Sequence, residues 1–225
     1  MKFCIKSIEK KNNKLRHIII ISKDNYYQYC KIPSKIIDKF NRGNISITHF
    51  SDLLRLDLLY TYGGIWIDST MWLVDNMPSN IDKLPLFTIK HGQFSDWHVC
   101  RGLWSSFFLA CGKGDSFIGF ARELLFSYWY RFDTIICYLL TDVLFCVAYD
   151  TFDWARKEID DIPWNNSDVF KLQDNCSRKY NEPLFNNWCK QTFAFKLSYK
   201  RPFPEKINGE ITFWGEIIRR TKNIN

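Results

Sequence analysis

The alternation of hydrophobic and polar positions divides the chain into short predicted helices and strands. Residues 15–21, Leu-Arg-His-Ile-Ile-Ile-Ile, form a run rich in β-branched side chains, which predicts a strand buried on both faces, as in parallel sheets. Further strands are predicted over Leu86–Lys90, Ser105–Ala110 and Phe193–Tyr199. Helices are predicted over Cys4–Lys11, Pro33–Phe40, Phe117–Tyr130, Ile135–Tyr149 and Ile211–Thr221, and a loop over Glu158–Trp164.

The most informative pattern lies between residues 48 and 70. Thr48 or Ser51 is placed to cap a helix that continues to the pair Gly63–Gly64. The glycines end this helix, because a left-handed C-cap favours glycine. A short apolar strand, Ile65–Ile67, follows, and Asp68 stands at its carboxyl end. This α/β crossover predicts that Asp68 lies at the sheet edge where open α/β proteins bind ligands.

One face of the predicted helix carries charged side chains. Asp52, Arg55 and Tyr62 share this face by their helical spacing. A carboxylate beside a guanidinium can hold sugar hydroxyls by charge-assisted hydrogen bonds, but the spacing alone also fits a plain surface salt bridge. Asp68 has two interpretations as well: it is a turn former, or it is the single carboxylate ligand of a divalent cation that carries a diphosphate.

Composition narrows the class of protein. The 225 residues are 46% hydrophobic, enough for one domain with a real core over residues 1–225. Eight cysteines without a CxxC pair, and an N-terminus too polar for a secretory signal, predict reduced thiols in a cytoplasmic protein. No stretch qualifies as a transmembrane helix, so we expect any membrane contact to be peripheral. The net charge of +7 favours anionic partners such as nucleotides or phospholipids.

The twenty residues Ser51–Thr70, SDLLRLDLLYTYGGIWIDST, resemble the core of the capsular polysaccharide synthesis glycosyltransferases, which are similar to a wider group with a DXD sugar-binding region. A weaker likeness extends over most of the chain, through Ser7–Tyr29, Trp104–Phe107, Tyr138–Asp142 and Phe195–Lys200. The resemblance implies an α/β fold of the GT-A type, with a Rossmann-type mixed sheet flanked by helices. The chain begins after the family's opening strand, so we expect that strand to be missing and hypothesise an N-terminally shortened domain.

The resemblance also implies roles for individual residues. Asp52 and Arg55 would hold the donor sugar, and Gly63–Gly64 would give backbone clearance. Asp68 would contact the nucleotide ribose and a diphosphate-bound Mn²⁺ or Mg²⁺. The motif is Asp68-Ser69-Thr70, so a hydroxyl stands where a second carboxylate usually ligates the metal.

Further site residues are proposed outside this segment. Tyr62 and Trp104 are candidates for substrate binding, and Lys196 and Lys200, with Arg201, for offsetting the charge of the leaving diphosphate. The catalytic candidate is Asp142, because a carboxylate interrupts an otherwise apolar helix there. Surface charge for the basic residues, core packing for Trp104 and a solvent-exposed position for Asp142 are the alternatives.

These inferences predict a retaining hexosyltransferase that moves a sugar from a nucleotide-sugar, with a UDP-sugar favoured, to a growing capsular or other surface polysaccharide. The expected acceptor is a lipid-linked oligosaccharide at the inner face of the membrane. The alternative is a non-catalytic remnant of the fold that acts as a binding subunit. Only the charge suggests nucleic acid, and no nucleic-acid motif is present, so no nucleic-acid partner is expected. The His and Cys spacings match no compact zinc site.

Overall fold

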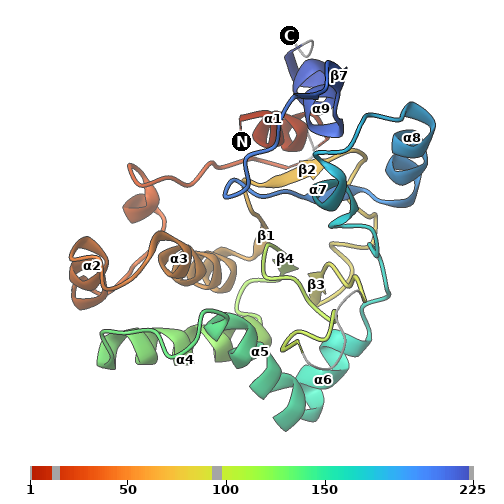
Figure 1. Ribbon diagram of the computed structural model, residues 1–225. Helices are drawn as coiled ribbons and strands as arrows, with labels where there is room; N and C mark the ends of the chain where they lie inside the picture. The colour runs from red at the N-terminus through yellow and green to blue at the C-terminus, as the bar shows by residue number, and fades with distance from the viewer. Residues whose placement is uncertain (1, 12–15, 93–97, 223–225) are drawn as a thin grey trace. The chain divides into compact units, whose positions relative to one another are not determined.

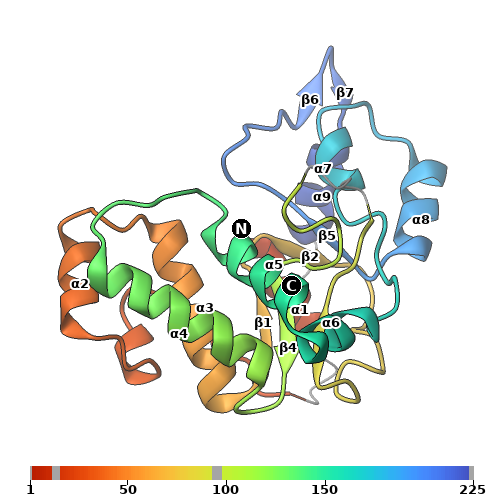
Figure 2. The same ribbon diagram turned by 90° about the horizontal axis from the view of Figure 1, so that it is seen from below.

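The computed structural model describes residues 2–11, 16–92 and 98–222, and it has a mixed α/β architecture (Figures 1 and 2). The chain folds as two compact units, each assembled from separate stretches of sequence. Unit 1 contains residues 1–18, 67–79 and 164–225, and unit 2 contains residues 19–66 and 80–163. The prediction of a single domain over residues 1–225 stays a prediction.

Unit 2 is mainly helical and carries a small sheet. Its strands are ordered β1-β4-β3, and β3 pairs antiparallel with β4. Helices α3 and α4 pack side by side, and α4 also packs on α5 (Figures 1 and 2). The helices are α2 (Ser34–Asn41), α3 (Ile47–Tyr62), α4 (Ser116–Arg131), α5 (Leu140–Thr151) and α6 (Asp153–Asp160), with a 3₁₀ turn at Tyr26–Gln28. The strands are β1 (Gly64–Ile67), whose last residue belongs to unit 1, β3 (Leu86–Thr88) and β4 (Phe108–Cys111).

Helix α3 begins and ends through local side-chain and backbone chemistry. The cap is Ser46, whose side chain accepts a hydrogen bond from the His49 backbone N–H, so the prediction of Thr48 or Ser51 as cap is wrong. The predicted glycine end is confirmed, because Gly63 adopts φ +70° and its N–H donates to the Leu59 carbonyl. A Cβ on Gly63 would lie 2.7 Å from the Lys113 backbone nitrogen. Glycine is therefore required here both for conformation and for close packing beside β4.

Unit 1 is built around an aromatic core. Its strands β2 and β5 pair antiparallel, with Met71 opposite Lys196, and β6 pairs with β7 in a hairpin. We call its buried residues the aromatic core; they include Phe185, Trp188, Phe195, Phe213 and Ile217. The elements are α1 (Lys2–Lys11), β2 (Met71–Leu73), α7 (Lys171–Asn175), α8 (Glu182–Gln191), β5 (Ala194–Lys196), β6 (Lys206–Ile207), β7 (Glu210–Ile211) and α9 (Phe213–Lys222).

The predicted α/β class is confirmed, but not the type of sheet. Each strand of the described residues has two to four residues, and the registers of β3–β4, β2–β5 and β6–β7 are antiparallel. The described residues therefore show no Rossmann-type parallel sheet. Residues 16–21 of the predicted β-branched strand are irregular, and Ile19 and Ile20 are about half exposed, so that prediction is wrong.

Other boundaries differ from the predicted ones. The predicted loop over Glu158–Trp164 begins inside α6, and the helix predicted from Ile135 begins at Leu140. All eight cysteines are free thiols, as predicted. No helix among the described residues has the length and apolar character needed to span a membrane.

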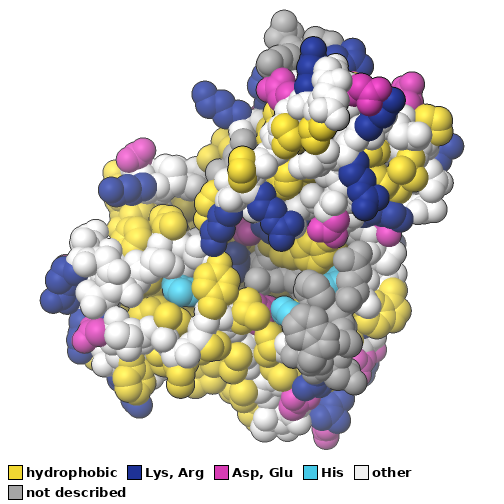
Figure 3. Space-filling model, in the orientation of Figure 1, with side chains coloured by type: hydrophobic (Ala, Val, Ile, Leu, Met, Phe, Trp, Pro, Cys, Tyr) yellow, Lys and Arg dark blue, Asp and Glu magenta, His cyan; other side chains and the backbone are white. Residues whose placement is uncertain are grey.

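The segment between α4 and α5 is held by a buried lysine and exposes apolar side chains. The Lys39 ammonium donates to the Trp129 and Phe132 carbonyls, both at 2.8 Å, and pairs with Asp133 at 3.0 Å. This places a cation at the carboxyl end of α4, where the helix dipole favours one. Hydrophobic side chains gather over α4 and α5 on the face drawn in Figure 3. In the segment between these helices, Phe132 and Ile136 are exposed.

Candidate functional site

Helix α3 presents the first pair of predicted site residues. Asp52 and Arg55 lie one turn apart, and the Arg55 Nη1 atom is 2.6 Å from the Asp52 Oδ1 atom. Only 5% of the Arg55 side chain and 15% of the Asp52 side chain are exposed. The pair is therefore not the plain surface salt bridge that the spacing alone allowed. Burial strengthens the pairing and fixes both side chains before a ligand binds.

A tryptophan that the sequence analysis did not assign to the site joins this pair. The Arg55 guanidinium lies over the ring of Trp66 in β1, 5.2 Å from its centroid. An aromatic face beside a cation contributes a cation–π attraction and gives a flat apolar surface on which a sugar ring can stack. The sequence feature that could have identified Trp66 as a site residue is its position in the short strand after the glycine pair.

Asp142, at the start of α5, is close enough to Asp52 and Arg55 for their charges to affect its pKa. The indole N–H of Trp104 donates to Asp142 Oδ1 at 3.1 Å, and Trp104 itself is buried. Burial raises the pKa of Asp142 to about 6, and the charge of Asp52 adds to this, whereas the Trp104 hydrogen bond and the charge of Arg55 oppose it. We call these five residues the Asp52 cluster: Asp52, Arg55, Trp66, Trp104 and Asp142.

The raised pKa predicts how stability depends on pH. Between the ordinary aspartate pKa of 3.8 and about 6, the folded protein binds more protons than the unfolded chain. The free energy of unfolding therefore falls as pH rises through this window, and the full loss is present above it. Asp142→Asn keeps an oxygen for Trp104 and has no charge to bury, so it should raise the melting temperature at pH 8.

Thermal unfolding of wild type and Asp142→Asn at pH 3.5, 5 and 8 measures this effect. The two proteins should melt alike at pH 3.5 and diverge progressively towards pH 8. An offset that is constant over the three pH values would contradict the assignment to a buried carboxylate. Asp150→Asn is a control with the opposite expected sign. In the wild type, the hydrogen bond from Arg101 lowers the pKa of Asp150. Removing that carboxylate should therefore slightly lower stability at pH 8.

Unit 1 contains the second group of predicted site residues. The Lys196 ammonium, at the end of β5, lies 3.1 Å from Asp68 Oδ2 and also donates to the Thr70 hydroxyl. Asp68 and Lys196 are both partly buried, with 25% and 19% of their side chains exposed. We call Asp68, Thr70 and Lys196 the Asp68 cluster. The predicted turn at Asp68 is also present, because the Met71 N–H donates to the Asp68 carbonyl at 2.9 Å.

The Asp68 cluster offers a divalent cation one carboxylate and one hydroxyl, both already hydrogen-bonded to the Lys196 ammonium. Mg²⁺ and Mn²⁺ prefer several oxygen ligands, and no three His, Cys, Asp or Glu side chains gather as ligands anywhere in the described ranges.

The remaining predicted site residues lie outside these contacts, and their roles stay predictions. The exposed Tyr62 donates its hydroxyl to the Tyr29 carbonyl at 3.0 Å. Gly63 precedes β1 and packs on the backbone of residues 111–113, and Gly64 is the first residue of β1. The Lys200 ammonium lies over the ring of its neighbour Tyr199, 5.8 Å from the centroid, in an exposed loop.

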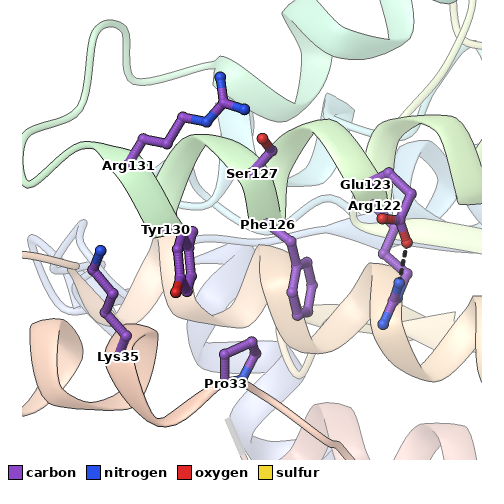
Figure 4. A pocket seen from close by; sticks show the side chains of 8 residues that line it. All are labelled: Pro33, Lys35, Arg122, Glu123, Phe126, Ser127, Tyr130 and Arg131. Carbon is purple, nitrogen blue, oxygen red and sulfur yellow. Dashed lines mark hydrogen bonds and ion pairs between the residues drawn. The ribbon is translucent and has the colours of Figure 1, made fainter.

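A surface groove in unit 2 shares no residue with either cluster. It has a volume of about 590 Å³ and is lined from α4 by Phe126, Tyr130 and Arg131, and from the start of α2 by Lys35 (Figure 4). Two of its other charged residues, Arg122 and Glu123, are paired with each other. The residues that line the groove therefore include none of the charged residues proposed for the site from the sequence.

Fold and contacts together define a mixed α/β protein with partly buried clusters of acidic and basic side chains. The chain belongs to the capsular polysaccharide synthesis protein family, whose model matches residues 1–216. Comparison with curated proteins and with solved structures gave no match. The family match confirms the resemblance and assigns the protein to capsular polysaccharide synthesis.

Proposed function

We propose that this protein is a retaining glycosyltransferase that moves a sugar from a nucleotide-sugar donor onto a growing surface polysaccharide. The observation that carries the proposal is the largely buried Asp52–Arg55 pair beside a second carboxylate, Asp142. Membership of the capsular polysaccharide synthesis family supports it, because such polymers grow by sugar transfer. A GT-A-like arrangement is part of the proposal, and the sequence of α3, glycine turn, β1 and Asp68 supports that part.

The Asp52 cluster has the chemistry to bind the donor sugar. Asp52 can accept hydrogen bonds from sugar hydroxyls while Arg55 donates to sugar oxygens, and Trp66 offers a ring face. Because the pair is formed in advance, little ordering is needed when the donor binds. Asp142, oriented by Trp104, would stabilise positive charge on the anomeric carbon once it is ionised.

The Asp68 cluster, taken by itself within unit 1, has the chemistry to bind a nucleotide diphosphate. A carboxylate accepts from ribose hydroxyls, and a lysine ammonium binds phosphate oxygens. In the proposed reaction, the bond between the anomeric carbon and the diphosphate oxygen breaks. The acceptor oxygen bonds to that carbon on the same face, and its proton passes to the leaving phosphate. The proposed role of Lys196 is to offset the negative charge that develops on the leaving group.

Donor binding tests the proposal. A nucleotide-sugar at about 100 times its dissociation constant should raise the melting temperature by roughly 5–10 °C, because ligand at that level adds about 2.7 kcal/mol to stability. UDP-sugars are expected to give the largest shift, together with slow hydrolysis of the donor. A panel of UDP-, GDP-, CMP- and dTDP-sugars measured by thermal shift, with released nucleotide as the second readout, checks this. No saturable shift from any donor at millimolar concentration would instead favour the non-catalytic remnant.

A further inference from the structure

The position of Lys196 is fixed by strand pairing. Met71 of β2 lies opposite Lys196 of β5, and the Leu197 N–H donates to the Thr70 carbonyl at 3.0 Å. The Lys196 N–H donates to the Val169 carbonyl at 2.7 Å. Backbone hydrogen bonds therefore hold Lys196 and Leu197 in place. The register of β2 and β5 sets the Lys196 side chain beside Thr70 and Asp68.

The neighbours of Lys196 in β5 hold the strand in place. Ala194 and Phe195 are fully buried, and Leu197 is 3% exposed. The Trp72 ring in β2 stacks on Phe195 with centroids 6.1 Å apart. Because a core this closely packed resists displacement, Lys196 is presented to Asp68 from a rigid strand rather than from a flexible loop.

The Lys196 ammonium donates hydrogen bonds to both ends of the acidic motif. Asp68 and Thr70 are the first and third residues of that motif. The hydroxyl at the third position adds no negative charge, so the motif has one carboxylate, and the Lys196 ammonium lies 3.1 Å from its Oδ2 atom. A second carboxylate there would supply a further oxygen ligand of the kind that divalent ions prefer.

We propose that Lys196 takes the place of a divalent cation in this protein, so that the diphosphate of the donor binds to a lysine and donor binding needs no metal. This inference rests on the proposed function. Phosphate oxygens accept hydrogen bonds from an ammonium, which acts as a compact positive charge. Asp68 and Lys196 keep 25% and 19% of their side chains exposed, so the cluster is not sealed from solvent.

Calorimetric titration of UDP into the full chain tests the proposal. The protein is first stripped with EDTA, and binding is then measured in EDTA and in millimolar Mn²⁺ or Mg²⁺. Wild type should bind UDP with dissociation constants that agree within about threefold in the three conditions. Lys196→Met, which keeps the length of the side chain and removes the charge, should weaken binding in EDTA by about 10- to 100-fold, as expected for a charged hydrogen bond. Lys196→Arg should recover most of that loss.

Lys190→Met is the matched control, because Lys190 is an exposed lysine on α8 of the same unit. It should bind UDP as wild type does. Binding by wild type only when Mn²⁺ or Mg²⁺ is present overturns the inference and leaves the proposed glycosyltransferase intact. Wild-type affinity in folded Lys196→Met also overturns it. Absence of UDP binding in every condition removes the proposed function and this inference together. The wild-type comparison decides the metal question even if Lys196→Met fails to fold.

Discussion

Arg55→Ala is expected to abolish donor turnover and to lower the melting temperature by roughly 6–12 °C, which corresponds to about 3 kcal/mol. The substitution removes the partner of Asp52 and the cation over Trp66. It also removes the positive charge that lowers the pKa of Asp142. Removing one member of a largely buried ion pair is costly because the other charge stays desolvated. Thermal unfolding by circular dichroism and release of nucleotide from the donor measure the two effects.

A surface pair provides the control for Arg55→Ala. Lys157 and Asp161 are one turn apart at the end of α6, and 74% and 54% of their side chains are exposed. Lys157→Ala should change stability by less than about 1 kcal/mol and leave turnover unchanged. Arg55→Lys keeps the charge but loses the planar fork, so its turnover should fall well below wild type. If Arg55→Ala melts and turns over like Lys157→Ala, the Asp52 cluster is not the sugar site.

Lys39→Met is expected to lower the melting temperature by a similar amount, roughly 6–12 °C for about 3 kcal/mol, without abolishing turnover. Only 2% of Lys39 is exposed, and its ammonium satisfies the last carbonyls of α4. Methionine keeps the apolar stem, so the loss measures the buried hydrogen bonds and the pairing with Asp133. Melting curves, with turnover assayed well below the midpoint, separate this structural effect from the combined effect of Arg55→Ala.

Lys35→Met is the matched variant on the same helix. The Lys35 ammonium is exposed and lies 4.2 Å from the centroid of the Tyr130 ring, a contact that contributes about 0.5–1 kcal/mol at an exposed site. Its melting temperature should therefore stay within a few degrees of wild type. An equal fall in melting temperature for the two lysine variants would mean that the buried hydrogen bonds of Lys39 stabilise the fold no more than an exposed lysine does.

The segment from α3 to Asp68 was predictable because its signals are local. A glycine pair after an amphipathic run sets the end of the helix, and Gly63 adopts the positive φ that this requires. The apolar residues that follow then form β1 as predicted. The cap was misplaced because several Ser and Thr residues stand near the start of α3, and only the hydrogen bond from His49 identifies Ser46.

The β-branched run before residue 22 shows that a local sequence pattern does not reveal whether a segment has a neighbouring strand. Its composition favours extended backbone, but a strand also needs a neighbouring strand to complete its ladder, and no sheet of the described residues includes residues 16–21. The half-exposed Ile19 and Ile20 also contradict the predicted burial on both faces. Hydrophobic character by itself was therefore not sufficient to predict a buried strand.

The contacts within the site depended on distant partners. Trp104 and Asp142 are 38 residues apart, and Lys196 and Asp68 are 128 residues apart. Each of these residues was a candidate from the sequence, but no spacing rule indicated which carboxylate each would meet. The pairing of β2 with β5, which brings Lys196 to Asp68, follows from tertiary packing that a single sequence does not reveal.

The aromatic core of unit 1 contains residues of α9 and of β5, the strand that carries Lys196. Phe213 and Ile217 of α9 belong to the same buried group as Phe195, one residue before Lys196. A deletion that removed α9 would open this group to water and loosen the end of β5. Trimming the protein at its C-terminus would then alter the affinity for a diphosphate even though no phosphate-binding residue had been removed.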